Sequence, residues 1–323
     1  MQGLLIEILM IAAFAVGVGT ISSMIGIGGG ILNTPLLVIV FALTTNMARA
    51  TSLVAALFVA ISSSFAYYRQ NPSPTVYRAG FFLAITTIPG SWVGGWLAVT
   101  IFNTYGDFAL RWVFAFLLFP VALKMLFARR KGKVDWVSEI EAFDFAQIPK
   151  KTLGFALAGG FLGGIVANLL GLGGGVIIVP VLSMIMGLPM HAAAATSMFT
   201  MIFTTSAGTV QNILSQSVDI FYALALGIGM LTGAQIGSRL ATRVDSVRLK
   251  HIFGLVLVYP LVRMVEAGRY LMGDDFLLKT IGDVIVWLAI VVPIGLITLY
   301  WRRNEPEGIV EEEPREVSTS GES

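Results

Sequence analysis

Two glycine-rich stretches, GIGGGILNTP at residues 26–35 and GLGGGVIIVP at residues 171–180, organise this sequence of 323 residues. They match at an offset of 145 residues (171 − 26), and four glycines and a proline coincide. The triplet Ala-Thr-Ser at 50–52 falls on the same triplet at 195–197, and GSWVGGWLA from Gly90 aligns with GAQIGSRLA from Gly233. The chain therefore contains an internal duplication.

The composition around these stretches is that of a membrane protein. Hydrophobic residues make up 56% of the chain and charged residues 12%, against about 25% charged in soluble domains. A bilayer-spanning helix needs about 20 mostly apolar residues. Segments of this kind run over 4–25, 46–68, 78–101, 109–127, 153–170, 193–214, 219–241, 248–265 and 280–301. Two shorter segments, 30–43 and 175–187, each follow a glycine cluster. The sequence predicts an all-α polytopic membrane protein.

The duplication divides the chain into two repeats of five segments each, in the order long, short, long, long, long. We expect a first transmembrane repeat at 1–127, a cytoplasmic linker at 128–151 and a second transmembrane repeat at 152–266. A final transmembrane helix with its preceding loop occupies 267–301, and a polar cytoplasmic tail occupies 302–323. The composition of this tail is typical of disorder. The N-terminal segment lacks a basic n-region, so we expect a retained helix and no cleaved signal peptide.

The distribution of basic residues predicts that the two repeats are inverted relative to each other. Lys and Arg concentrate in short cytoplasmic loops, and the linker has six basic residues. With the linker inside, alternation also places inside the bases Arg69, Arg78, Arg243, Arg248, Lys250, Arg302 and Arg303. The loop around 215–219, which corresponds to the loop with Arg69 and Arg78, has no base and falls outside. This scheme requires that each short segment completes a crossing.

The glycine clusters are the predicted substrate site. Glycine permits positive φ angles and close approach to the backbone, and irregular backbone at membrane depth survives where it lines a cavity. The helix after each cluster points free N–H groups and a partial positive charge at that cavity, which suits an anion. The glycines of the predicted site are Gly26, Gly28, Gly29, Gly30, Gly171, Gly173, Gly174 and Gly175.

Neutral polar residues complete the predicted site. The substrate-binding candidates are Thr51, Ser52, Thr196, Ser197, Gln211 and Gln235, with Ser22, Ser23, Asn33, Thr34 and Asn168 as further polar neighbours. The alternative role of any single Ser or Thr is close helix packing in lipid. Arg49 precedes the first Ala-Thr-Ser triplet, where the second repeat has Ala194. It either draws an anion into a vestibule or extends to the headgroups.

Other functional classes lack their residues. A phosphate-binding loop needs Lys and Ser or Thr after the last glycine, where Ile31 and Val176 stand. A dinucleotide site needs a soluble βαβ unit, and acid–base catalysis needs paired His, Asp or Glu at membrane depth. We therefore predict no enzyme, no cofactor, no metal site and, at a net charge of +2, no nucleic-acid partner. His191 and His251 are expected in solvated loops. Glu7 either binds a coupling cation or lies at the interface.

On GIGGGILNTPLL, GLGGGVIIVPVL and the two Ala-Thr-Ser triplets, the sequence resembles the TauE/SafE (sulfite exporter, TSUP) family over residues 8–300. The resemblance implies a multi-pass transporter of the plasma (inner) membrane for sulfite, sulfonates such as sulfoacetate, or other small organic anions. We expect export of sulfite or an organosulfonate by alternating access. An anion channel and a carrier of a small organic carboxylate are the alternatives. The partners are the small anion and the lipid bilayer, and a homo-oligomer is compatible with the sequence.

Overall fold

The computed structural model describes residues 2–39, 41, 43–126, 138, 140, 143, 145, 148–244, 249, 251–252, 254–255, 258, 261–262, 267–273 and 276–304. All regular elements in these ranges are helices. They are α1 (Gln2–Ile25), α2 (Gly30–Ile39), α3 (Thr45–Tyr68), α4 (Tyr77–Leu126), α6 (Lys150–Leu169), α7 (Gly175–Pro180), the π-helix η2 (Val181–Ile185), α8 (Met190–Leu214), α9 (Ile220–Ala241), α11 (Ala267–Met272) and α12 (Phe276–Asn304).

The two short segments predicted after the glycine clusters are confirmed. Helix α2 has 10 residues, and α7 has 6 residues before it widens into the 5-residue η2. At about 1.5 Å per residue, each covers about half of a bilayer core of about 30 Å. The break before each helix lies at glycines with positive φ, including Gly26 (81°) and Gly171 (71°). Few other residues adopt this backbone conformation.

Helix α4 joins two segments that the sequence predicted separately. The expected segments 78–101 and 109–127 lie on either side of a kink at Gly106, whose φ of 72° and ψ of −170° are not helical. The predicted boundary between the two segments is therefore confirmed, although α4 runs on without a loop. The predicted segment 248–265 and the linker 128–151 fall largely outside the described residues, as does the tail beyond Asn304.

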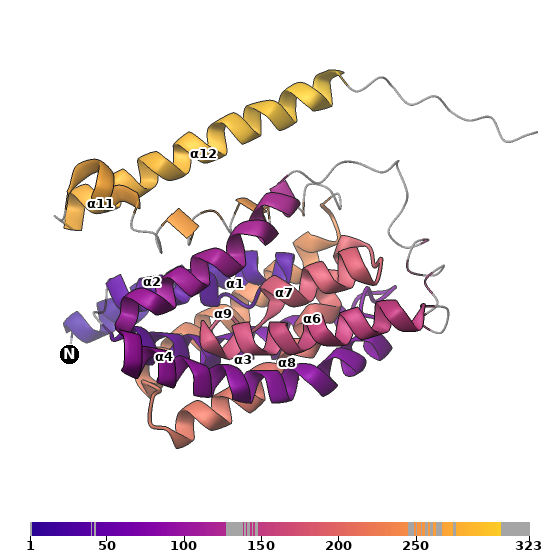
Figure 1. Cartoon of the computed structure of the whole chain (residues 1–323), viewed down its shortest axis with the longest axis horizontal. Helices are drawn as coiled ribbons and strands as arrows, with labels where there is room; N and C mark the ends of the chain where they lie inside the picture. Colours follow the sequence, from indigo (N-terminus) through magenta and orange to yellow (C-terminus); the bar gives the residue numbers. More distant parts are fainter. Residues whose placement is uncertain are drawn as a thin grey trace, which may run out of the picture.

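Helices from the two halves of the chain pack against each other through glycine. In Figure 1 the bundle helices run along the long axis, and α12 lies at one edge with α11 beside it. Helix α9 packs along α1, where Gly233 and Gly237 approach the backbone of Val16 and Thr20 too closely for a side chain. Helix α4 packs along α6 in the same way, through Gly90 and Gly94. Such small-residue contacts are typical of helix packing in membranes.

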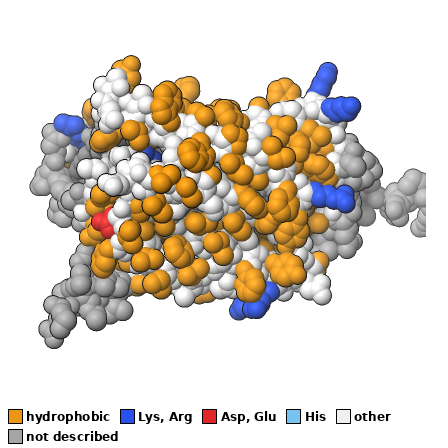
Figure 2. Space-filling view, turned by 90° about the horizontal axis from the view of Figure 1, so that it is seen from below, with side chains coloured by type: hydrophobic (Ala, Val, Ile, Leu, Met, Phe, Trp, Pro, Cys, Tyr) orange, Lys and Arg blue, Asp and Glu red, His pale blue; other side chains and the backbone are white. Residues whose placement is uncertain are grey.

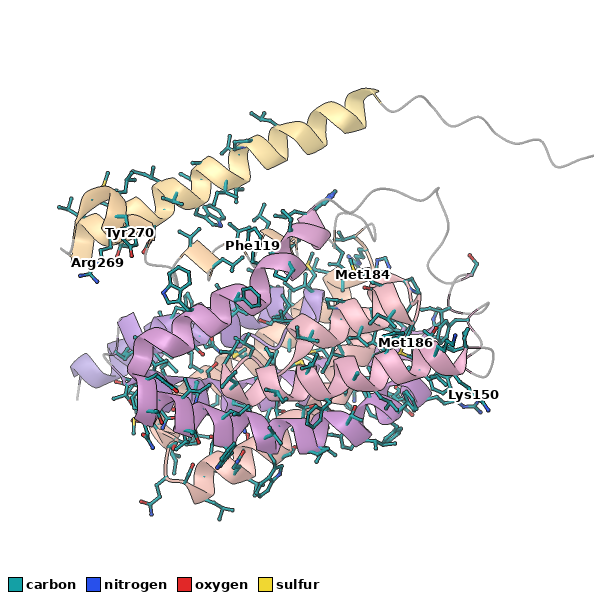
Figure 3. The ribbon with its side chains drawn as sticks, in the orientation of Figure 1. Phe119, Lys150, Met184, Met186, Arg269 and Tyr270 are labelled. Atoms are coloured by element: carbon teal, nitrogen blue, oxygen red, sulfur yellow. The ribbon has the colours of Figure 1, made fainter. Side chains whose placement is uncertain are left out.

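The surface and the helix lengths identify a polytopic membrane protein. Four described helices are long and apolar enough to span a bilayer, at 45–68, 77–106, 150–169 and 220–241. Hydrophobic side chains cover the face in Figure 2, and Lys and Arg lie at its margins. Lys150, at the start of α6, and Arg269, in α11, lie at opposite ends of the long axis (Figure 3). This pattern fits an apolar belt between two wet ends.

Candidate functional site

The two glycine clusters cross in direct backbone contact. A side-chain carbon at Gly30 would overlap the carbonyl group of Gly171, and one at Gly175 would overlap the carbonyl group of Gly26. These two contacts are equivalent under the 145-residue offset of the sequence. The prediction that the clusters come together is therefore confirmed.

Two of the predicted hydroxyl groups form a second pair of matched contacts. Ser52 donates to the carbonyl oxygen of Gly171 at 3.0 Å, and Ser197 donates to that of Gly26 at 2.9 Å. Both serines are fully buried. Each serine therefore ties helix α3 or α8 to the glycine cluster of the opposite half.

The neighbouring threonines accept hydrogen bonds from the segments that lead into α9 and α4. Thr51 accepts from the backbone N–H of Asp219, and Thr196 accepts from that of Val76, each at 2.9 Å. The hydroxyl groups of both Ala-Thr-Ser triplets are thus bonded to protein in this conformation.

The short helices begin with backbone donors that have no acceptor. Within the described part of the chain, no group accepts a hydrogen bond from the N–H groups of Gly30 and Ile31 in α2 or of Gly175 and Val176 in α7. All four residues are buried. Buried N–H groups almost always have a partner, and a helix N-terminus carries a partial positive charge. These donors suit an anion.

A single methionine side chain fills the space between the two clusters. The terminal methyl group of Met201 in α8 lies where side chains at Gly28 and at Gly173 would stand. Met201 is fully buried, and Ala56 takes its place in the first half of the sequence. The crossing is therefore filled from the second half alone.

Arg49 is a buried cation surrounded by amide groups. Its guanidinium group is in a side chain only 1% exposed. Nε and Nη2 donate to the side-chain oxygen of Asn46 at 2.9 and 2.6 Å. Nη1 donates to the carbonyl and side-chain oxygens of Asn168 at 3.0 and 3.3 Å and to the side-chain oxygen of Asn212 at 3.3 Å. We call Arg49, Asn46, Asn168 and Asn212 the Arg49 cluster. Among the described residues, no carboxylate forms an ion pair with Arg49.

The two predicted glutamines lie in different places. Gln211 accepts a hydrogen bond from Asn168 at 2.8 Å and donates to the carbonyl oxygen of Trp92 at 3.0 Å, so it borders the Arg49 cluster. Gln235 instead donates to the backbone and side chain of Ser62, at 3.0 and 2.9 Å, on the contact between α9 and α3. Gln235 forms no hydrogen bond with either glycine cluster among the described residues and belongs to helix packing.

Two alternatives from the sequence are wrong. Arg49 does not extend to the headgroups, because its side chain is buried against α6 and α8. His191 does not lie in a solvated loop, because it is in the first turn of α8, is 3% exposed and has Nε2 2.6 Å from the carbonyl oxygen of Val244. The side chain of Glu7 lies outside the described residues.

Sequence reasoning missed three residues of the site. Asn46 precedes Arg49 by three positions, so the spacing of one helical turn could have identified it. Asn212 and Met201 gave no such signal. At the offset of the duplication, Asn212 aligns with Tyr67 and Met201 with Ala56.

Two buried polar atoms of α2 have no hydrogen-bond partner among the described residues. The side-chain oxygens of Asn33 and Thr34 form no hydrogen bond in the described structure. Both residues are at most 2% exposed. The second half has Ile178 and Val179 at these positions. The described residues hold no group of three His, Cys, Asp or Glu placed to bind a metal ion.

Comparison with known proteins places the chain among membrane transporters. The family model "Sulfite exporter TauE/SafE" matches residues 10–264. The chain is 27% identical to the "Probable membrane transporter protein YunE" of Bacillus subtilis, over 78% of this chain and 95% of that protein. It is 25% identical to a "Probable membrane transporter protein" of Methanocaldococcus jannaschii, over 79% of this chain and 93% of that protein. Comparison with solved structures gave no match.

Proposed function

Because this chain belongs to the TauE/SafE sulfite exporter family, a family of multi-pass cell-membrane transporters and not of enzymes, we propose that it exports sulfite or an organosulfonate. The mechanism we propose is alternating access around a central anion site on the Arg49 side of the glycine crossing. The observation that carries the proposal is a buried arginine with only neutral partners among the described residues.

A buried charge is costly unless another charge or a set of hydrogen bonds offsets it. The carbonyl oxygen of Asn168 lies in the last turn of α6, where the helix dipole is negative, so it offsets part of the charge of Arg49. Nη2 carries two N–H groups and has one described acceptor, Asn46. The remaining positive charge and the free donor are suited to an oxyanion, which would enter as the missing counter-ion.

The free N–H groups of α2 support the same placement. Helix α2 starts at Gly30, which lies against Gly171, and Gly171 lies against the backbone of Arg49. The corresponding start of α7 at Gly175 lies against Gly26, which contacts Ala194. Backbone donors are thus present in both halves. Arg49 adds a cation beside the first set, whereas Ala194 stands at the corresponding position of the second half. We place the anion where the donors of α2 and the Arg49 cluster meet.

Inverted repeats would supply the movement. The matched contacts of the two halves, Ser52 with Gly171 and Ser197 with Gly26, support a two-fold relation between them. In such transporters the two halves rock about a fixed site built from broken helices. The tightly packed glycine crossing would serve as the pivot, and the hydroxyl groups would hold each half to it.

The test is flux of labelled sulfite into proteoliposomes that contain the purified full-length protein, with the membrane potential held constant. We expect saturable uptake that unlabelled isethionate, an organosulfonate, competes away. The Arg49→Gln variant should lower this uptake by at least about tenfold. Arg69→Gln is the matched control, because Arg69 is an exposed arginine at the other end of α3.

Each outcome of this experiment bears on the proposal. Uptake that rises linearly with concentration and meets no competition would indicate an anion channel. Competition by lactate and not by isethionate would indicate a carboxylate carrier. Normal saturable uptake by Arg49→Gln would contradict the placement of the site.

A further inference from the structure

The charge of the Arg49 cluster bears on the charge of the anion that the site can hold. Arg49 contributes one positive charge, and its described hydrogen-bond partners Asn46, Asn168 and Asn212 are neutral. The backbone donors of α2 add dipoles and no net charge. An empty site of this composition therefore carries one positive charge.

The described charged and histidine side chains of the neighbouring helices form no described bond with Arg49. On the helices packed against α3, and at the starts of those helices, they are Arg78, Lys150, Lys151, His191, Asp219 and Arg239. Lys150 and Lys151 start α6, whereas Asn168 stands at its far end, about 27 Å away. His191 likewise starts α8, and Asn212 lies near its end.

Among the described acids, Asp219 is linked to the segment around Arg49 by a hydrogen bond. Its backbone N–H donates to Thr51, two residues after Arg49. Its carboxylate caps α9 by accepting from the N–H groups of Phe221 and Tyr222, at 3.0 and 3.2 Å, and the residue is half-buried. This carboxylate is bonded to the start of α9 and has no described ion pair with Arg49, so it is not the direct counter-ion of the guanidinium group.

Resting on the proposed function, we infer that the site takes anions of single charge and discriminates against anions of double charge. A monoanion makes the occupied, water-excluded site neutral as the two halves rock. A dianion leaves one uncompensated negative charge at membrane depth, where charge is costly. For sulfite, the transported species is then the singly charged bisulfite form. Among organosulfonates, the substrates are those with the sulfonate as their sole charge.

Two organosulfonates of closely similar size test the inference. Isethionate carries one negative charge, and sulfoacetate carries two. In proteoliposomes at equal concentration and constant potential, we expect isethionate flux to exceed sulfoacetate flux by about tenfold or more. Equal fluxes, or faster sulfoacetate flux, would overturn the inference while leaving anion transport intact. No flux of either anion, together with no flux of sulfite, would overturn the proposed function and this inference with it.

The pH dependence of sulfite flux is an independent test. Raising pH through the second ionisation of sulfite converts the monoanion to the dianion, whereas the charge of isethionate stays the same. We expect the ratio of sulfite flux to isethionate flux to fall as pH rises, in proportion to the bisulfite fraction. A ratio that is constant or that rises would contradict selection by charge.

The Arg49→Lys variant separates charge from shape. It keeps the positive charge and loses the planar fork of donors. We expect weaker binding of both sulfonates and an unchanged preference for isethionate. Thermal shift of the detergent-solubilised variant by isethionate reports binding without transport. Loss of the preference in a variant that still binds isethionate would contradict the assignment to charge.

Discussion

The two halves of this transporter make matched contacts at their glycine clusters and differ in the side chains around them. Gly30 contacts Gly171 as Gly175 contacts Gly26, and the serine bonds from α3 and α8 are equally matched. The side chains around these contacts diverge. At the 145-residue offset, Arg49 corresponds to Ala194. Asn33 and Thr34 correspond to Ile178 and Val179. A symmetric scaffold can therefore carry an asymmetric site.

The difference indicates how duplication constrains each half. The glycines are held in place by backbone contact, which any added side chain would disrupt on either side. Arg49 lies against Gly171 through its backbone, as Ala194 lies against Gly26, so its backbone contact is matched while its side chain is free to differ between halves. We therefore expect substitutions in the scaffold to act equally in both halves and substitutions in the polar cluster to act in one half alone.

The largest effects should come from the crossing itself. Gly30→Ala and Gly175→Ala each force a methyl group into the backbone of the other cluster, which cannot move aside cheaply. We expect each variant to lose about 3 kcal/mol of stability or more, and by similar amounts. The thermal unfolding midpoint in detergent measures both.

The matched controls are Gly17→Ala in α1 and Gly154→Ala in α6, where a methyl group meets nothing within 4 Å. These variants should unfold within a few degrees of the native protein. If Gly30→Ala were tolerated while Gly175→Ala was not, the crossing would not be equivalent in the two halves.

A second prediction concerns the polar cluster of one half. Asn212→Asp puts a carboxylate beside Nη1 of Arg49, where the amide oxygen now lies at 3.3 Å. The internal ion pair would compete with the substrate anion for the guanidinium group. We expect the affinity for isethionate to fall about thirtyfold, which corresponds to about 2 kcal/mol. Competition against labelled sulfite measures it.

Asn212→Ala, which removes the same amide without adding charge, is the control for this variant. It should weaken isethionate binding much less than Asn212→Asp. Equal weakening by both variants would mean that Asn212 acts through packing, and the cluster would then have no role in charge balance.

The third prediction uses the one methionine shared by both clusters. Gly173→Ala places a methyl group on the terminal carbon of Met201, so a second change, Met201→Ala, should relieve the overlap. We expect the double variant to regain about 1 to 2 kcal/mol relative to the sum of the single variants. The positive φ of Gly173, 82°, keeps recovery incomplete.

Met198→Ala in the same helix is the matched control. Met198 is equally buried, and it is not among the nearest neighbours of any glycine in the two clusters. It should not rescue Gly173→Ala. Rescue by both methionine variants would indicate general loosening of α8, and the shared contact would then not explain the coupling.

The sequence predicted the scaffold better than the cluster, for a physical reason. Glycine and proline act locally, so GIGGG and GLGGG located the breaks before α2 and α7 directly. The bond from Arg49 to Asn212 joins residues 163 positions apart, and no local pattern encodes such a contact. The break at Gly106 falls between the predicted segments 78–101 and 109–127, because the non-helical backbone of this glycine ends one helix before the next begins. The family match agrees with the duplicated motifs that suggested it.

The smallest effects should come from the serine bonds, and these decide between packing and substrate binding for the hydroxyl groups. Ser52→Ala and Ser197→Ala each remove one buried bond to a glycine carbonyl group. We expect each to lower the free energy of unfolding by about 1 kcal/mol, by similar amounts in both halves. Because both hydroxyl groups already donate to protein, the KM for sulfite should change little. A large rise in KM with an unchanged unfolding midpoint, in Ser52→Ala alone, would instead make Ser52 a ligand of the anion and extend the asymmetric site into the scaffold.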